Sequence, residues 1–368
     1  MGGAHAQTFD PAGVTQLSAA LRIRQTGAYA FVAFASEDDN KMDELRVPGF
    51  SLDRVSTQSG VVQYRTQNAI ATRRRGRKPQ ATFREVKGNF FLSKLITPSA
   101  FVFVTPERDE YVRDGLSRFL YRARAQFTRA RLTSREMLSI VLEMARATSS
   151  KVVTNRSLIR SKRNEATISY KAESIKEVYE YARESNANVS GFDFSLISLD
   201  GEVLLRAGLN RDGKLSFLSG STEYFIKEFI EIVAQTVKSR TDLLTNRARS
   251  EATGSVKPLR LTFEKPLLTD AANIRSFLEV LGRIRHGEFT LFHRNPYLHL
   301  NFFDFFDASA FDVVVESTES LVVIPQLDSS LPSLFRLCQK IFEQFEEGVV
   351  TDATDVVTTP SLPPGWND

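Results

Sequence analysis

The chain has 368 residues, a formal net charge of +4, 42% hydrophobic residues and 25% charged residues. This composition, with 28 Phe, excludes an intrinsically disordered chain, and the length allows two or three domains. The single cysteine, Cys338, excludes an intramolecular disulfide, and no run approaches the roughly 18 apolar residues that cross a bilayer, so we expect a cytoplasmic protein without a membrane segment.

Charge is segregated along the chain. Residues 113–163 contain 13 Lys or Arg and three acids, whereas residues 302–368 contain 12 acids and two basic residues. A basic segment of this kind is typical of proteins that bind DNA or RNA, and it would equally suit an acidic protein. The acidic segment indicates a surface for a basic protein partner. That partner could be a second copy of the chain, which makes a homo-oligomer possible.

Residues 1–104 are expected to form a β-rich domain with a basic hairpin. Residues 61–71 and 81–91 have the composition of strands, so the sequence RRRGRKP at 73–79 should lie at the tip of a β-ribbon. Arginines beside a glycine can enter a narrow minor groove, and the motif resembles the core of an AT-hook. The candidate contacts to nucleic acid here are Arg73, Arg74, Arg75, Arg77 and Lys78.

The same domain contains a candidate catalytic motif. Glu85 and Lys87, on the second of these strands, resemble the E-x-K element of the PD-(D/E)xK nucleases. The resemblance implies a carboxylate that holds Mg²⁺ and a lysine that orients the attacking water, with Asp53 as the upstream acid. A chance occurrence on a strand with alternating exposed charges is the competing interpretation, and on that interpretation we expect no cofactor.

Residues 105–164 are expected to form a basic helical segment. A strand at 100–104 precedes Thr105, an N-cap residue, and a helix should run from 107 to about 131 with an apolar stripe at three-and-four spacing. Arginines that avoid this stripe would form a cationic ridge suited to phosphate oxygens. They are Arg113, Arg118, Arg122, Arg124, Arg129 and Arg131.

A second basic stretch follows in this segment. Thr133 and Glu136 form a capping box before another amphipathic helix. Residues 151–163 should form a short basic helix and then a strand, an order that resembles a winged helix-turn-helix. Arg156, Arg160 and Arg163 would then contact nucleic acid. The alternative is a basic hairpin in contact with solvent.

Residues 165–249 and 257–348 share an order of elements. The first segment should fold as β-α-β-β-β-α, with strands joined by a turn at Asp200-Gly201, and the second as β-α-β-β-β-β-α. We therefore predict an α+β, multidomain protein with antiparallel sheets and flanking helices, including a possible tandem repeat. The order is similar to that of the TATA-binding-protein fold, in which a curved sheet saddles nucleic acid. This resemblance covers about half the chain and is topological.

The carboxyl-terminal half contains two further features. The last predicted helix, 331–347, places Phe335, Phe342 and Phe345 on one face, which should be core, with acidic residues on the other. These acids are Glu343, Glu346 and Glu347. Residues 349–368 should form a disordered acidic tail.

The sequence offers little other chemistry. His293, His299 and Asp304 could ligate a metal, although histidines on strands are usually structural, and we expect no metal. No phosphate-binding loop or dinucleotide fingerprint is present. We therefore expect a non-enzymatic nucleic-acid-binding protein with an acidic interaction surface. The alternatives are a Mg²⁺-dependent nuclease and an adaptor subunit in a protein assembly.

Overall fold

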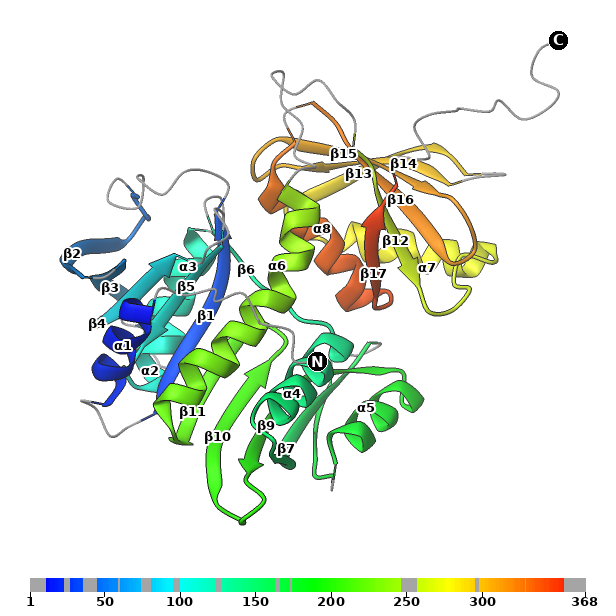
Figure 1. The fold of residues 1–368 in the computed structure, drawn as a ribbon. Coiled ribbons are helices and arrows are strands. Elements are labelled where there is room, and N and C mark those ends of the chain that lie inside the picture. Colours follow the sequence, from blue (N-terminus) through cyan, green and yellow to red (C-terminus); the bar gives the residue numbers. More distant parts are fainter. Residues whose placement is uncertain are drawn as a thin grey trace, which may run out of the picture. The chain divides into compact units, whose positions relative to one another are not determined.

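The computed structural model describes residues 11–22, 27–35, 45–58, 60–73, 81–94, 100–123, 127–162, 166–172, 174–245, 257–294, 298–327 and 329–353. These residues form an α+β protein with two antiparallel sheets, as predicted (Figure 1). The chain divides into two compact units, Met1–Lys238 and Ser239–Asp368. Each unit is built around one of the sheets.

The sheet of the first unit has 11 strands among the described residues. Ten of them follow the order β2-β3-β4-β5-β1-β11-β10-β9-β7-β8. The eleventh, β6, pairs with the second half of β1, next to the end of β11, which pairs with the first half. The sheet therefore joins three segments that the sequence predicts as separate domains, 1–104, 105–164 and 165–249. Its strands are β1 (Ala28–Ala35), β2 (Phe50–Gln58), β3 (Val61–Arg73), β4 (Ala81–Lys94), β5 (Ala100–Thr105), β6 (Phe127–Arg129), β7 (Lys151–Ser161), β8 (Thr167–Tyr170), β9 (Ala187–Ile197), β10 (Val203–Asn210) and β11 (Lys214–Gly220).

Helices cover different parts of the two faces of this sheet. On one face, α4 and α5 contact β7 and β9, while the π-helix η3 contacts β10 and continues into α6 (Figure 1). On the other face, the continuous helix α2-η2-α3 packs on β3 and β4. The helices are α1 (Pro11–Arg22), α2 (Asp109–Tyr111), η2 (Val112–Leu116), α3 (Ser117–Arg122), α4 (Ser134–Ala147), α5 (Ile175–Glu184), η3 (Tyr224–Ile230) and α6 (Glu231–Thr245).

An aromatic core lies between α2-η2-α3 and the sheet. The buried ring of Phe90 lies 5.5 Å from those of Tyr64 and Phe103, and 5.7 Å from that of Phe119 on α3. The ring of Tyr111 packs directly against the backbone of Gly88 and Gly115. A β-carbon at residue 88 or 115 would lie 2.4 or 2.6 Å from this ring, so a larger residue would clash with it. These two glycines let the helix approach β4 closely.

The second unit has a six-stranded sheet in the order β13-β14-β15-β16-β12-β17. Helices α7 and α8 contact each other, and Phe345 after α8 packs edge-on against Phe277 of α7 and Phe263 of β12. Cys338 on α8 is buried, as expected of a small apolar side chain. The elements are β12 (Leu259–Phe263), α7 (Ala271–Gly282), β13 (Gly287–His293), β14 (His299–Asp304), β15 (Ser309–Val315), β16 (Ser320–Pro325), α8 (Leu331–Gln344) and β17 (Gly348–Asp352).

The two segments predicted as tandem copies differ in strand order. Their elements follow the predicted sequence, but β8 lies at the sheet edge beyond β7, whereas β12 lies beside β16. The second unit instead matches residues 28–129. There β2-β3-β4-β5-β1-β6 has the same order and the same antiparallel pairings as β13-β14-β15-β16-β12-β17, and each segment places its helix before the last strand.

Two further predictions in the first unit are wrong. The helix predicted to reach residue 131 ends at Arg122, because Phe127 packs against Phe101 and Phe103 while β6 pairs with β1. Residues 151–161 form strand β7 and no helix, so the winged helix-turn-helix does not form; β7 pairs with β8 as a hairpin, which is the alternative interpretation. Pairing of β7 with β9 along its whole length outweighs the local preference for a helix.

The predicted boundary of the acidic tail at residue 349 is wrong. Residues 348–352 form β17, in which Val349 and Val350 pair with Thr262 and Leu261 of β12. Residues 354–368 lie outside the described part. Among the helices of the described residues, none is both long and apolar enough to cross a membrane.

Candidate nucleic-acid interface

The basic hairpin predicted from the sequence is formed by β3 and β4. Their register runs unbroken from Val61 paired with Ser93 to Arg73 paired with Ala81. Strand β2 pairs with β3 only up to Asn68, and β5 pairs with β4 only from Phe91. Residues 69–73 and 81–85 therefore extend from the sheet as a two-stranded ribbon, about 17 Å long at the usual rise per residue. Arg74, Arg75, Arg77 and Lys78 at its tip lie outside the described residues.

The candidate nuclease residues are not brought together. Glu85 accepts a hydrogen bond from Gln67 and forms an ion pair with Lys87 at 3.0 Å, and all three lie on the exposed face of the sheet. Asp53 lies on β2 and pairs with Arg65 of β3. It is therefore two strands away from Glu85 of β4, and Arg65 is four residues along β3 from Ala69, the partner of Glu85. Standard sheet spacings put about 16 Å between Asp53 and Glu85, too far for both to ligate one Mg²⁺ ion.

The arginines of the predicted helical ridge are partly neutralised by an acid. Asp114 on η2 is buried and accepts ion pairs from Arg84 at 2.7 Å, Arg113 at 3.0 Å and Arg118 at 3.9 Å. The hydrogen bond from Arg113 is the main reason that the pKa of Asp114 is lowered. Arg122 donates instead to the carbonyl oxygen of Pro48 at 2.5 Å. Arg124 lies outside the described residues.

Strands β7 and β9–β11 expose a second, polar face. Their apolar alternate residues point toward α4, α5 and η3, as in the edge-on contact of Phe194 with Phe229. The other alternate residues point the opposite way, so they face the side of the sheet away from α6. We call this the basic sheet face. Its cations are Arg156 and Arg160 of β7, Arg206 of β10 and Lys214 of β11, together with Arg129, Arg131 and Arg211 at one end.

Pairing of β6 with β1 brings Arg129 and Arg131 to this face, next to Arg211 of the β10–β11 turn. Leu132 N–H donates to the carbonyl of Arg211 in the β10–β11 turn, and Arg129 lies over the ring of Phe31 at 5.9 Å. Arg131 forms an ion pair with Asp212 at 3.7 Å. Burial lowers the pKa of Arg131, and the nearby positive charges of Arg129, Arg160 and Arg211 lower it further. The structure thus gathers Arg129, Arg131 and Arg160 from segments far apart in sequence. Arg163 lies outside the described residues.

A row of polar residues crosses the basic sheet face. Arg156 pairs with Asp193 on β9, Asp193 with Gly208 on β10, Gly208 with Ser216 on β11, and Ser216 with Tyr29 on β1. Gly208 leaves room for the Asp193 side chain, because a β-carbon at residue 208 would lie 2.5 Å from Oδ1 of Asp193. At the end of the row Lys214 donates to Asp109 at 2.8 Å and lies 4.4 Å from the ring centroid of Tyr29.

The electrostatics of this row are unusual at Asp193. Burial raises the pKa of its carboxyl group, although Arg156 and Lys214 act in the opposite direction. Asp109 differs: the hydrogen bond from Lys214 is the main reason that its pKa is lowered. Asp193, Arg206, Arg211 and Lys214 were not among the predicted site residues, because alternation on a strand does not reveal which face stays uncovered.

The histidine candidates of the second unit do not assemble a metal site. His293 and His299 pair across β13 and β14, but Asp304 lies at the far end of β14. Within the described residues, no group of three potential metal ligands is present. Asp304 serves another purpose, since it accepts from Arg336 at 2.9 Å and from Ser333 at 2.9 Å.

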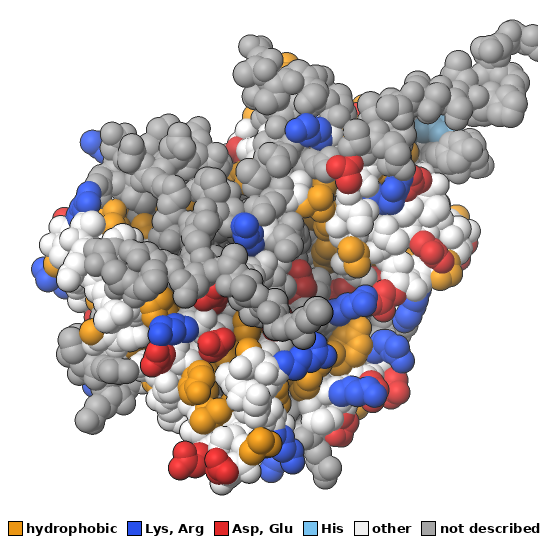
Figure 2. Space-filling view, viewed as in Figure 1, with side chains coloured by type: hydrophobic (Ala, Val, Ile, Leu, Met, Phe, Trp, Pro, Cys, Tyr) orange, Lys and Arg blue, Asp and Glu red, His pale blue; other side chains and the backbone are white. Residues whose placement is uncertain are grey.

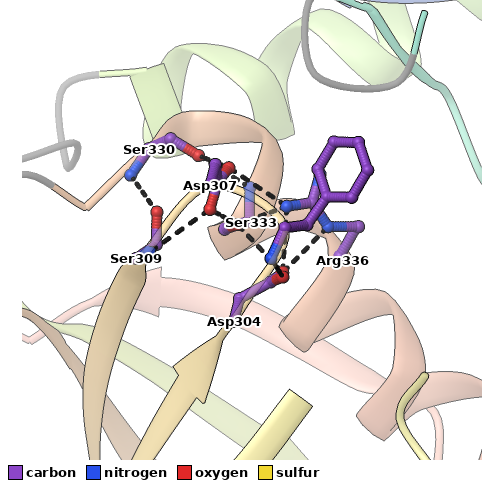
Figure 3. A network of polar contacts seen from close by, with 7 residues as sticks. Asp304, Asp307, Ser309, Ser330, Ser333 and Arg336 are labelled. Atoms are coloured by element: carbon purple, nitrogen blue, oxygen red, sulfur yellow. Dashed lines mark hydrogen bonds and ion pairs between the residues drawn. The ribbon is translucent and has the colours of Figure 1, made fainter. Parts of the chain in front are cut away.

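That contact belongs to a buried polar network at the start of α8 (Figure 3). Asp307 accepts from the hydroxyls of Ser330 and Ser333 at 2.5 Å and from Arg336 at 3.1 Å. Burial opposes ionisation of Asp307, but these donors outweigh it and lower its pKa. Ser330 also caps α8 by accepting from Ser333 N–H. Since these acids already have donors in the fold, the network has a structural role.

The glutamates of the acidic surface predicted on α8 are only partly exposed to solvent. Glu343 forms an ion pair with Lys340 at 2.7 Å, and its side chain is 16% exposed. Glu346 and Glu347 are half-buried.

The sequence matches no protein-family model and no curated protein sequence.

Proposed function

We propose that this protein binds nucleic acid without cleaving it, and that the basic sheet face is the main contact surface, with the β3–β4 ribbon as a second one. The observation that carries the proposal is the gathering of cations from β6, β7, β10 and β11 on one face of the sheet. Among the residues that β7 and β9–β11 direct to this face, all of which lie in the described part, Asp193 is the one acid.

The repulsion within the cationic cluster favours an anionic ligand. Burial is the main cause of the lowered pKa of Arg131, Asp212 opposes the shift, and the charges of Arg129, Arg160 and Arg211 add to it, so these arginines repel one another. A phosphate placed between them would relieve that repulsion and offer oxygens that arginine can hold with two hydrogen bonds. A chain of phosphates could contact several of these arginines at once, and the release of its counterions would add to affinity.

The opposite side of the protein gives less support for a polyanion. Among the coloured side chains in Figure 2, viewed from the side of α6, basic and acidic groups are interspersed. On α5, for example, Lys176 forms an ion pair with Glu180 at 3.6 Å. Mixed charge of this kind gives no extended region of one sign.

The first prediction concerns salt and the basic sheet face. The affinity for a nucleic acid should fall with salt at a slope of about 0.9 per phosphate contacted in duplex DNA, or about 0.7 in a single strand. The double variant Arg156→Ala, Arg206→Ala should weaken binding and reduce that slope by about 2, because both side chains are exposed cations of this face. Fluorescence anisotropy between 50 and 300 mM salt measures both quantities.

A matched control removes the same charge elsewhere. Lys176→Ala with Arg183→Ala changes two exposed cations of α5, on the other side of the sheet. Equal loss of affinity in both double variants would contradict the assignment of the face. Absence of binding by the unmodified protein at 50 mM salt would refute the proposed function. Magnesium-dependent cleavage that disappears in Glu85→Gln would establish the nuclease alternative.

The second prediction concerns the ribbon. Replacement of Arg73, Arg74, Arg75, Arg77 and Lys78 by Ala should weaken binding without lowering the melting temperature. A β-ribbon can enter the major groove of duplex DNA, so the loss should be larger for duplex than for single-stranded ligands. Titrations of both ligands against the variant, with thermal denaturation as the stability measurement, check this. Equal affinity of the variant and the unmodified protein for duplex would exclude the ribbon from the interface.

A further inference from the structure

Asp193 is the least expected group on the basic sheet face. A carboxylate beside bound phosphates would repel them, and it sits at the centre of the face, with Arg156 directly across on β7 and Gly208 directly across on β10. Ser195 on the same strand is used differently, since it accepts from the side chain of Asn155 at 2.9 Å. Within the described residues, Asp193 has no hydrogen-bond donor of its own.

Small residues flank Asp193, which is itself half-buried. Gly208 and Gly191, which flank it on β10 and β9, have no side chains to cover it, and Ser216 beyond Gly208 is small. Half-burial raises the pKa of Asp193, so its charged form lacks full solvation in the free protein. A ligand that brings N–H donors to both oxygens would supply the missing hydrogen bonds.

Within a nucleic acid, such donors occur only on the bases. We propose, on the basis of the proposed function, that Asp193 binds the Watson–Crick edge of an unpaired guanine while the surrounding arginines hold the flanking phosphates of a single strand. Guanine presents N1–H and the N2 amino group side by side, which matches the two oxygens of a carboxylate. Adenine and cytosine place a ring acceptor beside their single amino group, and uracil places a carbonyl on each side of its N–H. These acceptors face a carboxylate unfavourably.

Base pairing would hide the group that Asp193 needs. In a duplex, guanine N1–H is bonded to cytosine, so the two-donor edge is available only in single strands, loops or ends. The inference therefore assigns the basic sheet face to single-stranded ligands, as distinct from the duplex expected for the ribbon. The sugar plays no part in this contact, so RNA and DNA should show the same base preference.

The test uses the full chain and fluorescein-labelled 12-mers of uridine with one central guanosine, adenosine, cytidine or inosine. Guanosine should bind about tenfold more tightly than adenosine or cytidine. Inosine lacks only the N2 amino group, so it should lose most of that advantage without any change to the protein. The deoxy versions, with thymidine in place of uridine, should rank in the same order.

Two variants locate the preference. In Asp193→Asn, which has nearly the same shape, the amide cannot accept both donors, so all four RNAs should bind with affinities within about twofold of one another. Asp212→Asn removes the same charge from the exposed β10–β11 turn at the end of this face and should keep the guanosine preference. Circular dichroism confirms that both variants are folded.

The outcomes separate this inference from the proposed function. Binding with equal affinity for guanosine and inosine, or a guanosine preference that persists in Asp193→Asn, would overturn the role of Asp193 but leave the nucleic-acid function intact. Absence of binding to any strand would remove both.

Discussion

Phe335→Ala is expected to lower the free energy of unfolding by about 3–5 kcal/mol. Phe335 lies on the buried side of α8 and is 1% exposed, so truncation leaves a cavity between the helix and the sheet of the second unit. Urea denaturation followed by circular dichroism at 222 nm measures the loss.

The matched control for Phe335 lies in the same unit. Phe305 is 59% exposed in the β14–β15 turn, so Phe305→Ala should change the free energy of unfolding by less than about 1 kcal/mol. If both substitutions cost the same, α8 does not pack on the sheet as described.

Arg336→Met is the second large effect, also expected at about 3–5 kcal/mol. Arg336 is the cation that contacts both Asp304 and Asp307, and Asp304 is only 4% exposed. Removal of the guanidinium leaves buried negative charge without its partner, although the serine hydroxyls remain. Chemical denaturation at pH 7 measures the cost.

The pH dependence provides an independent measurement of this network. The pKa of Asp307 is lowered in the folded protein, so its ionised form contributes stability above its unfolded pKa of about 3.9. That stability should be lost as the pH falls through the lower, folded pKa. In Arg336→Met the acid-side loss should be smaller, because one of the donors that lower this pKa is gone.

Two controls test whether Arg336 stabilises the fold through its charge. Arg283→Met removes an exposed cation of the same unit, whose ion pair with Glu279 spans 3.7 Å, and should cost less than about 1 kcal/mol. In the background of Arg336→Met, the further change Asp304→Asn should recover part of the lost stability, since it removes the unpaired charge. No recovery would mean that Arg336 acts through packing rather than through charge.

Local features of the sequence predict most of the individual elements. The capping box of Thr133 and Glu136 forms with both hydrogen bonds, and Ser174 and Ser330 cap the helices predicted after them. The turn at Asp200-Gly201 joins β9 and β10 as expected, and Phe335 and Phe342 are core. These features are readable because a cap, a turn or an apolar stripe involves residues within a few positions of one another.

Residues 127–129 and 151–161 show where this local information ends. The local sequence of each segment predicts a helix, yet each forms a strand, because β6 pairs with β1 and β7 pairs with β9. The β1 partners of β6 are 92–96 residues away and the β9 partners of β7 are 26–46 residues away, so no local pattern identifies them. Strand formation depends on the partner, so it is decided when the sheet assembles.

The candidate site divides in the same way. The sequence by itself determined that arginines are concentrated at 113–163 and at the hairpin, and that no familiar catalytic motif accompanies them. Only the tertiary structure decided which of them act together: Arg113 and Arg118 meet Asp114, whereas Arg129, Arg131 and Arg160 join Arg206, Arg211 and Lys214. The physical reason is that one continuous sheet orders strands from distant segments, and in the described part of the chain α4, α5 and η3 pack on the face opposite to the one that carries Asp193.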